Sequence, residues 1–195
     1  METLSLHEWQ VTTVRAREIQ LELSPRVSQE GTVMAPRFIA GMDISVNRWT
    51  RTGIAAAVVL GYPGLQIVEV AIVTGRLDFP YVPGLLTFRE APLVLAACGK
   101  LKVTPDLFIA DGQGFAHPRR IGLASHLGLC LDTPTIGCAK SRLCGEYDEP
   151  ELEQGSFTEL KDSGEVIGAA LRTRSGVKPV FVSVGHKISL PEAVR

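Results

Sequence analysis

The first third of the chain carries one helical pattern of apolar residues, followed by three strand patterns. Between Leu6 and Leu23, apolar residues recur at helical spacing with charged residues between them, which predicts an amphipathic helix. Three segments rich in apolar and β-forming residues follow at 38–46, 53–60 and 66–74. Short turns separate them, one of them at 47–52, and short turns join antiparallel strands. We therefore expect a three-stranded antiparallel meander.

The rest of the chain alternates between helical and strand patterns. The helical patterns cover 88–102, where Pro92 is expected in the first turn, and 119–131. The strand patterns cover 107–110, 135–139, 165–171 and 179–184. Such alternation is typical of α/β proteins with parallel strands. Together with the meander it predicts one mixed sheet with helices on both faces.

The last residues of the sequence predict the start of a further helix. Ser189, Pro191 and Glu192 form a capping-box signature with a proline near the first helical position, and the sequence stops shortly afterwards at Arg195. We expect residues 1–195 to form a single domain that is truncated at the start of a C-terminal helix.

Composition is consistent with one domain and narrows its environment. A chain of 195 residues with 45% hydrophobic content is long enough to bury a sizeable core. No apolar run reaches the ~18 residues needed to cross a membrane, and the first ten residues do not resemble a secretion signal. We expect a cytoplasmic protein that does not bind membranes and needs no obligate protein partner. The four cysteines show neither a disulfide framework nor zinc-ligand spacing.

Charge alone does not decide the function. The net charge is -1, but residues 146–165 hold 8 acidic residues against the single base Lys161. This acidic segment predicts a solvated loop or helix face that does not contact nucleic acid.

Three acidic residues lie in or next to segments that the sequence predicts to be strands or helices, at positions where a charged side chain needs an explanation. Asp43 lies inside the apolar segment FIAGMDISV, where an unpaired buried carboxylate would cost several kcal/mol. Asp111 ends the strand pattern DLFIAD and is followed by glycines, at the strand end where open α/β sheets place their sites. Glu90 opens the preceding helix. Taken singly, each acid is better explained by a structural role. Taken together, the three suit a hard cation, magnesium or manganese rather than zinc.

Basic residues and histidines follow the same strand ends. His117, Arg119 and Arg120 come after Asp111, Lys140 follows the next strand, and His186 follows a later one. Metal sites built from carboxylates usually serve phosphate chemistry, for which nearby positive charge is useful.

Taken together, these motifs make the sequence resemble the endonuclease V family. The resemblance rests on GMDIS, PYVPGLLTFRE, DGQGFAHPRRIGLASHLG, IGCAKSRLCG and VSVGHKIS, in this order from about Arg37 to the end. It implies a ribonuclease H-like fold and magnesium-dependent cleavage of DNA at the second phosphodiester bond 3′ to a deoxyinosine, leaving 3′-hydroxyl and 5′-phosphate ends, in DNA repair. Manganese is expected to substitute for magnesium.

The resemblance also implies roles for particular residues. Asp43 and Asp111 would bind magnesium directly, and Glu90 would complete the acidic site. Lys140 and His186 would contact the scissile phosphate or its water, with His117 as a supporting partner.

The same resemblance assigns the DNA-binding residues. The extruded lesion base would enter a pocket formed near Gly84, Leu85, Gly112 and Gly122. Tyr81 would act as a wedge in the duplex, held stiffly in the loop by its neighbours Pro80, Val82 and Pro83.

Three alternatives remain at this stage. A relative with the same site would prefer inosine in RNA, a non-catalytic module would bind nucleic acid on the same fold, and a metal-free interaction protein would show no thermal shift with magnesium. The presence of all three acids disfavours the non-catalytic module.

Overall fold

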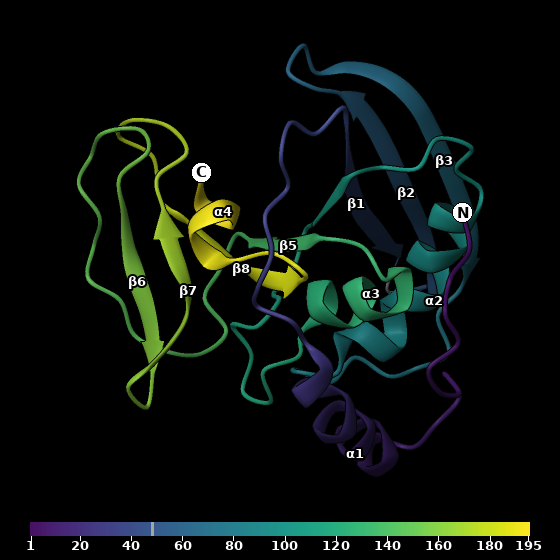
Figure 1. The fold of residues 1–195 in the computed structure, drawn as a ribbon. Coiled ribbons are helices and arrows are strands. Elements are labelled where there is room, and N and C mark those ends of the chain that lie inside the picture. The colour runs from purple at the N-terminus through teal and green to yellow at the C-terminus, as the bar shows by residue number, and fades with distance from the viewer. Residues whose placement is uncertain (48) are drawn as a thin grey trace.

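Strands from all parts of the chain join into one eight-stranded sheet with the order β3-β2-β1-β4-β5-β8-β7-β6 (Figure 1). The structure, a computed structural model, describes residues 1–47 and 49–195. The strands are β1 (Phe38–Asn47), β2 (Thr52–Gly61), β3 (Gln66–Arg76), β4 (Leu107–Ala110), β5 (Thr135–Ala139), β6 (Phe157–Asp162), β7 (Glu165–Leu171) and β8 (Val180–His186).

The predicted meander is confirmed. β1 pairs with β2 and β2 with β3, both antiparallel. The turn expected at 47–52 includes Arg48, which lies outside the described residues. Along β1 the residues alternate in environment: Ala40 and Met42 are buried, whereas Gly41 and Asp43 are exposed on the opposite face. This alternation, the period-two rule of a strand, decides which side chains of β1 are available for chemistry.

The second half of the sheet is only partly parallel. β4 pairs parallel with β1, and β5 parallel with β4, as expected. β8 then pairs antiparallel with β5 and with β7, and β7 antiparallel with β6. The expectation that the later strands are all parallel is therefore wrong, because no crossover helix separates β6, β7 and β8 along the chain.

The acidic segment contains a strand that the sequence did not predict. β6 occupies Phe157–Asp162, where a loop or helix face was expected, and it forms a hairpin with β7. Arg120 binds this hairpin through ion pairs to Asp162 at 2.9 Å and Glu165 at 2.6 Å. Part of the acidic charge is thus balanced within the protein.

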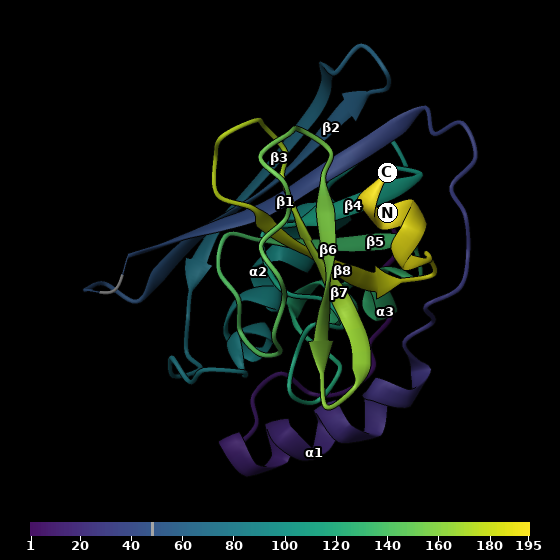
Figure 2. The ribbon, with the colours of Figure 1, turned by 90° about the vertical axis from the view of Figure 1, so that its left-hand side faces the viewer.

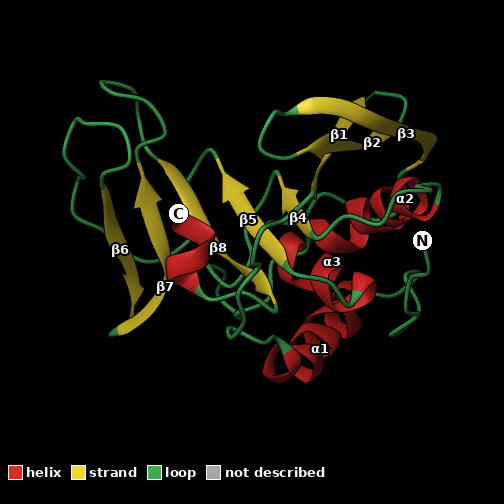
Figure 3. Ribbon diagram, turned by 45° about the horizontal axis from the view of Figure 1, so that its top comes forward, coloured by secondary structure: helices red, strands yellow, loops and turns green. Residues whose placement is uncertain are grey.

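Helices cover both faces of the sheet, as predicted. α2 (Leu86–Gly99) and α3 (Leu123–Leu131) bury a core against β1, β2 and β4 on one face, and α1 (Thr13–Leu23) packs outside them (Figures 1 and 2). The short α4 (Leu190–Val194) packs on the other face against β7 and β8, apart from the three other helices (Figure 3). The described part of the chain holds no helix that is long and apolar enough to span a membrane.

Three predicted helix starts are wrong. α1 begins at Thr13 rather than Leu6, since Thr12 caps it by accepting from the Arg15 N–H at 3.2 Å. α2 begins at Leu86, so Pro92 lies inside the helix and not in its first turn. α3 begins at Leu123 rather than Arg119, because Arg120 adopts a positive φ of 56° that no helix accommodates.

Candidate active site

Asp43 and Asp111 are neighbours across the parallel strands β1 and β4. The register pairs Met42 with Ala110, and the Asp111 N–H donates to the Met42 carbonyl at 3.0 Å. Adjacent strands lie about 4.8 Å apart, so the two carboxylates leave the sheet at the same level. The parallel pairing thus brings together two of the three acids that the sequence singled out.

Asp43 is exposed, which corrects the expectation of a buried carboxylate. Its side chain lies on the face of β1 opposite Ala40 and Met42, and its Oδ1 accepts from the Ile44 N–H at 2.7 Å. The apolar residues around it in the sequence point to the other side of the sheet. The desolvation cost that the sequence suggested therefore does not arise.

Lys140 provides positive charge beside Asp111. It follows β5, which lies parallel to β4, so both residues stand just beyond the carboxyl ends of neighbouring strands. The Lys140 ammonium forms an ion pair with Asp111 Oδ2, and this contact raises the pKa of the lysine. The Lys140 side chain is 80% exposed, so it is free to move toward a bound substrate.

Glu90 faces the two aspartates from the first turns of α2. Its pKa is raised to about 7, mainly by burial; the positive charge of Arg89 lowers it, and the negative charges of Asp43 and Asp111 contribute to the rise. Glu90 therefore lies close enough to the two aspartates for their negative charges to act on it.

This donor set fits a hard divalent cation. All three side chains offer carboxylate oxygens, which magnesium and manganese prefer, and a cation would relieve the repulsion that acts on Glu90. As the side chains stand, no group of three or more acidic, histidine or cysteine side chains among the described residues is placed so that it could hold a metal ion. Asp111 instead turns toward Lys140.

A pocket of about 320 Å³ opens directly beside the acids. Glu90, Asp111 and Lys140 line one side of it. The other walls include three of the predicted glycines, with apolar side chains from α2 and α3: Gly84, Gly112, Gly122, Leu86 and Leu123. The glycine main chain gives this pocket walls that offer hydrogen-bonding groups close to a ligand.

Gly122 holds two walls of the pocket in close contact. A Cβ atom at this position would lie 2.3 Å from the Gln113 carbonyl oxygen, so only glycine fits there without a main-chain shift. Its N–H donates to the Gly114 carbonyl at 2.8 Å. Gly122 therefore determines how closely the start of α3 approaches the loop after β4.

Tyr81 stands on the rim of the pocket. Its side chain is 65% exposed and also borders an adjoining groove of about 620 Å³ that Pro80 lines as well. The Arg89 guanidinium donates to the Phe79 carbonyl at 2.8 Å and so attaches the start of this loop to α2. An exposed aromatic ring is thus carried on an anchored loop next to Glu90.

Three other residues of this loop have different surroundings. Pro83 lines the pocket together with Tyr81. Val82 is half-buried against the core beneath α1. Leu85 is fully buried in the same core, and it is the next residue, Leu86, that lines the pocket. Both neighbours of Leu85 in the chain, Gly84 and Leu86, thus line the pocket.

His117 lines the pocket but contacts main chain rather than the acids. Its Nε2 lies 3.0 Å from the Gly84 carbonyl oxygen, and its Nδ1 accepts from the Arg119 N–H at 3.1 Å. Burial lowers the pKa of His117 to about 4, so the imidazole is neutral at physiological pH. These contacts indicate that His117 supports the pocket wall.

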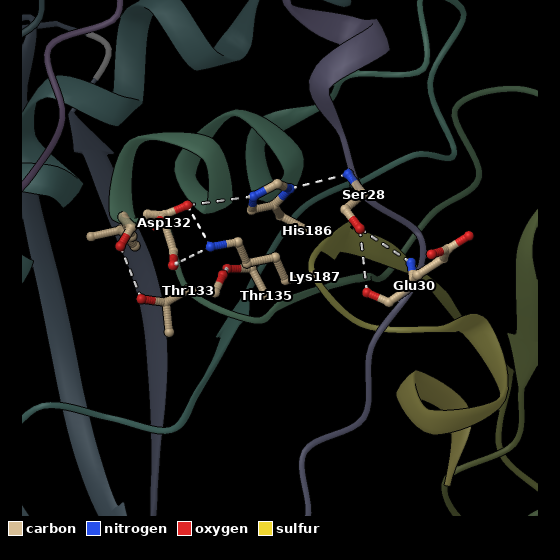
Figure 4. Close-up of polar contacts among 8 residues, drawn as sticks. Ser28, Glu30, Asp132, Thr133, Thr135, His186 and Lys187 are labelled. Carbon is tan, nitrogen blue, oxygen red and sulfur yellow. Dashed lines mark hydrogen bonds and ion pairs between the residues drawn. The ribbon is translucent and has the colours of Figure 1, made fainter.

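His186 lies at the other end of the sheet, so its expected position beside Lys140 is wrong. Because β8 runs antiparallel to β5, His186 pairs with Thr135, the first residue of β5. The stretch from Thr135 to Lys140 corresponds to about 16 Å of strand. There His186 Nδ1 accepts from the Ser28 N–H at 3.2 Å and Nε2 lies 3.9 Å from Asp132 (Figure 4). In this structure His186 is a buried structural residue.

Two residues near the pocket had no predicted role in it. Gln20 on α1 is fully buried, and its side chain binds the Gly84 carbonyl and Arg119. Arg119 also donates to the Gly84 carbonyl. The sequence offered one indication of the role of Gln20, because this polar residue falls on the apolar face of the helix predicted at Leu6–Leu23.

Sequence comparison supports these observations. A sequence model of the family described as Endonuclease V matches residues 21–195. The chain is 51% identical over 188 residues to Endonuclease V of Dehalococcoides mccartyi, covering 96% of this chain and 84% of the relative. It is 50% identical over 195 residues to Endonuclease V of Gloeobacter violaceus, covering 98% and 79%.

Structural comparison gives the same family. The crystal structure of the Endonuclease V from Streptomyces avermitilis superposes with a TM-score of 0.90 at 46% identity, over 95% of this chain and 82% of that one. The Endonuclease V of Ciona intestinalis, in complex with a 23mer DNA containing an inosine followed by a ribo-adenosine, superposes with a TM-score of 0.79 at 30% identity. That match covers 94% of this chain and 87% of the Ciona chain.

Proposed function

The chain belongs to the endonuclease V family, with its ribonuclease H-like fold, and on this premise we propose that it cleaves DNA at deoxyinosine. The reaction is hydrolysis of the second phosphodiester bond 3′ to the lesion, leaving 3′-hydroxyl and 5′-phosphate ends, with magnesium or manganese as cofactor. The observation that supports the proposal is that Asp43 and Asp111 lie on adjacent strands, while Asp111 and Glu90 line a pocket with glycine walls. The Ciona relative was crystallised with inosine-containing DNA, in agreement with this substrate.

The acids would hold the metal ion. Asp43 and Asp111 present their carboxylates from adjacent strands, and Glu90 approaches from α2. A bound divalent ion neutralises phosphate oxygens and lowers the pKa of a water molecule that it holds. The exposed Lys140 ammonium, which pairs with Asp111 in this structure, would donate to a phosphate oxygen, where the transition state gathers negative charge.

The pocket would receive the extruded base. Enzymes that act on a base within a duplex turn it out of the stack, and they identify it by hydrogen bonds to its edge. Inosine lacks the exocyclic amino group of guanine, so close main-chain walls at Gly84, Gly112 and Gly122 favour the smaller base. The exposed ring of Tyr81 would fill the gap in the duplex. Binding and cleavage are then performed by neighbouring parts of one site.

A cleavage assay tests this proposal. A 5′-labelled duplex with a single deoxyinosine is incubated with magnesium, with manganese or with a chelator, and the product length gives the position of the cut. We expect a nick at the second bond 3′ to deoxyinosine only when a metal is present. Equal cleavage of an undamaged duplex, or cleavage in the chelator, would contradict the proposal. A matched RNA oligomer with one inosine distinguishes the DNA nuclease from a ribonuclease of the same family.

A further inference from the structure

Three side chains converge on one main-chain atom in the pocket wall, the carbonyl oxygen of Gly84. Gln20 Nε2 lies 3.1 Å from it, His117 Nε2 3.0 Å and Arg119 Nη2 2.8 Å. Gln20 belongs to α1, whereas His117 and Arg119 belong to the loop between β4 and α3. We call Gln20, His117 and Arg119 the Gly84 clamp.

The hydrogen bonds of His117 fix its proton. The Arg119 N–H donates to His117 Nδ1, so this nitrogen carries a lone pair. In the neutral imidazole the proton is then on Nε2, where it is donated to the Gly84 carbonyl. All three members of the clamp are therefore donors toward the same oxygen.

Gln20 connects two walls of the pocket. Its Nε2 donates to the Gly84 carbonyl at 3.1 Å and to the Ile121 carbonyl at 3.2 Å. Its Oε1 accepts from Arg119 Nε at 2.6 Å. Gly84 lines one wall, and Ile121 directly precedes Gly122, which lines another. The side-chain amide of Gln20 thus connects the wall that contains Gly84 with the wall that begins after Ile121.

Packing alone does not require an amide at this position. The other buried residues of α1 are Ala16, Ile19 and Leu23, and they pack against the core beneath α2 and α3. Burying an amide is favourable only when its hydrogen bonds are made, as they are here. Unlike an apolar side chain, Gln20 makes directional hydrogen bonds, and these hold the Gly84 and Ile121 carbonyl groups at a set separation.

Gly84 needs such support because its conformation is unusual. Its φ is 76°, in the left-handed region, and it directly follows the proline-bounded loop that carries Tyr81. A Cβ atom at this position would approach Arg119 Nη2 to 2.9 Å, so the clamp closes tightly around the glycine. The clamp therefore fixes both the pocket wall and the end of the Tyr81 loop.

We propose that Gln20 is a positioning residue that sets the width of the base pocket by holding the Gly84 and Ile121 carbonyls together. This inference rests on the proposed function, since it concerns how that pocket selects its base. Gln20 does not touch the acids. Its loss is expected to affect binding and selection of the base, while the rate of bond cleavage in the saturated complex is preserved.

The test uses Gln20→Met, which keeps the length of the side chain and removes all of its hydrogen bonds. Ile19→Val is the matched control, because it loses packing in the same helix without touching the clamp. Steady-state and single-turnover cleavage are measured on duplexes with deoxyinosine and with deoxyguanosine at the same position. For Gln20→Met we expect KM for deoxyinosine to rise at least tenfold and the preference over deoxyguanosine to fall, with the single-turnover rate at saturation within threefold of wild type. Ile19→Val should leave all three unchanged.

A second variant keeps the test informative if Gln20→Met folds poorly. Arg119→Gln removes another donor to the Gly84 carbonyl and is expected to change KM and base preference in the same direction. Because both side chains bind the same oxygen and each other, the double variant should show less than the product of the single effects. Unchanged KM and preference in either folded variant, or multiplicative effects, would overturn the inference. If the wild-type protein fails to nick deoxyinosine DNA, the proposed function itself fails.

Discussion

We expect Glu90→Gln to stabilise the protein at alkaline pH in the absence of a divalent metal, while abolishing cleavage. Burial and the charges of Asp43 and Asp111 raise the pKa of Glu90 from its ordinary value of 4.5 to about 7. Between these two pH values the folded state keeps a proton that the unfolded state has lost. The stability associated with this proton is fully present below pH 4.5 and is lost as the pH rises to about 7.

The size of the effect follows from the same two values. Each pH unit between the folded and unfolded pKa corresponds to about 1.4 kcal/mol, so the difference of about 2.5 pH units means that ionised Glu90 costs about 3.5 kcal/mol above pH 7. Glutamine has nearly the same shape and carries no charge. Allowing for partial exposure of the site, we expect the free energy of unfolding at pH 8 to rise by about 1 to 3 kcal/mol, and to change by less than about 1 kcal/mol at pH 4.5.

The assay is urea unfolding at pH 4.5, 6 and 8 in a chelator, with Glu153→Gln as the control. Glu153 is exposed in the acidic segment and does not line the pocket, so its replacement removes the same charge outside the candidate site. Magnesium should raise the melting temperature of the wild type more than that of Glu90→Gln, since binding to the folded state stabilises it. If Glu90→Gln destabilises the protein equally at pH 4.5 and 8, the pKa of Glu90 is not raised in the folded protein as described.

Three further variants examine other parts of the structure. Gly122→Ala should lower the free energy of unfolding by about 1 to 3 kcal/mol, because its Cβ meets the Gln113 carbonyl, and should reduce cleavage at deoxyinosine more than affinity for undamaged DNA; equal losses would contradict the assignment of the pocket. Tyr81→Ala should change stability by less than about 0.5 kcal/mol in urea unfolding, because the ring is exposed, yet weaken binding to deoxyinosine DNA by about 1 to 3 kcal/mol in a titration; unchanged affinity would leave the loop with a structural role only. Burial lowers the pKa of His126 to about 3, so the unfolded state binds a proton more readily below pH 6.5 and stability falls as the pH drops, by up to about 1.4 kcal/mol per pH unit. His126→Phe should flatten this slope between pH 6.5 and 4 in urea unfolding, and an unchanged slope would assign it to other groups.

Local patterns in the sequence predicted most of the sheet and the two aspartates. The meander followed from apolar segments joined by short turns, and β4 and β5 from short apolar strands between helical patterns. Asp111 and Lys140 could be placed together because both follow strands that prove to be parallel neighbours. Where the order of strands was simple, residues at strand ends were placed correctly.

The errors arose where position depends on strand direction or on distant contacts. His186 also lies at the carboxyl end of its strand. Because β8 runs antiparallel to β5, this end of β8 lies beside the amino end of β5, away from Lys140. β6 was missed because its exposed charged residues gave no clear apolar alternation. The role of Gln20 depends on contacts with Gly84 and Arg119, which are 64 and 99 residues away in the chain. No local pattern contains that information.

We propose that Asp43 and Asp111 serve cleavage, and that the neighbouring pocket binds the lesion without Asp43. The most direct measurement compares wild type and Asp43→Asn on one deoxyinosine duplex in magnesium, recording single-turnover nicking together with binding by fluorescence anisotropy. Asp43 is exposed, and within the part of the chain that the structure describes its side chain bonds only the N–H of its neighbour Ile44, so the variant should fold normally. We predict that nicking falls by at least about 100-fold while affinity changes less than about threefold. Nicking at the wild-type rate by the metal-saturated Asp43→Asn protein would contradict the account.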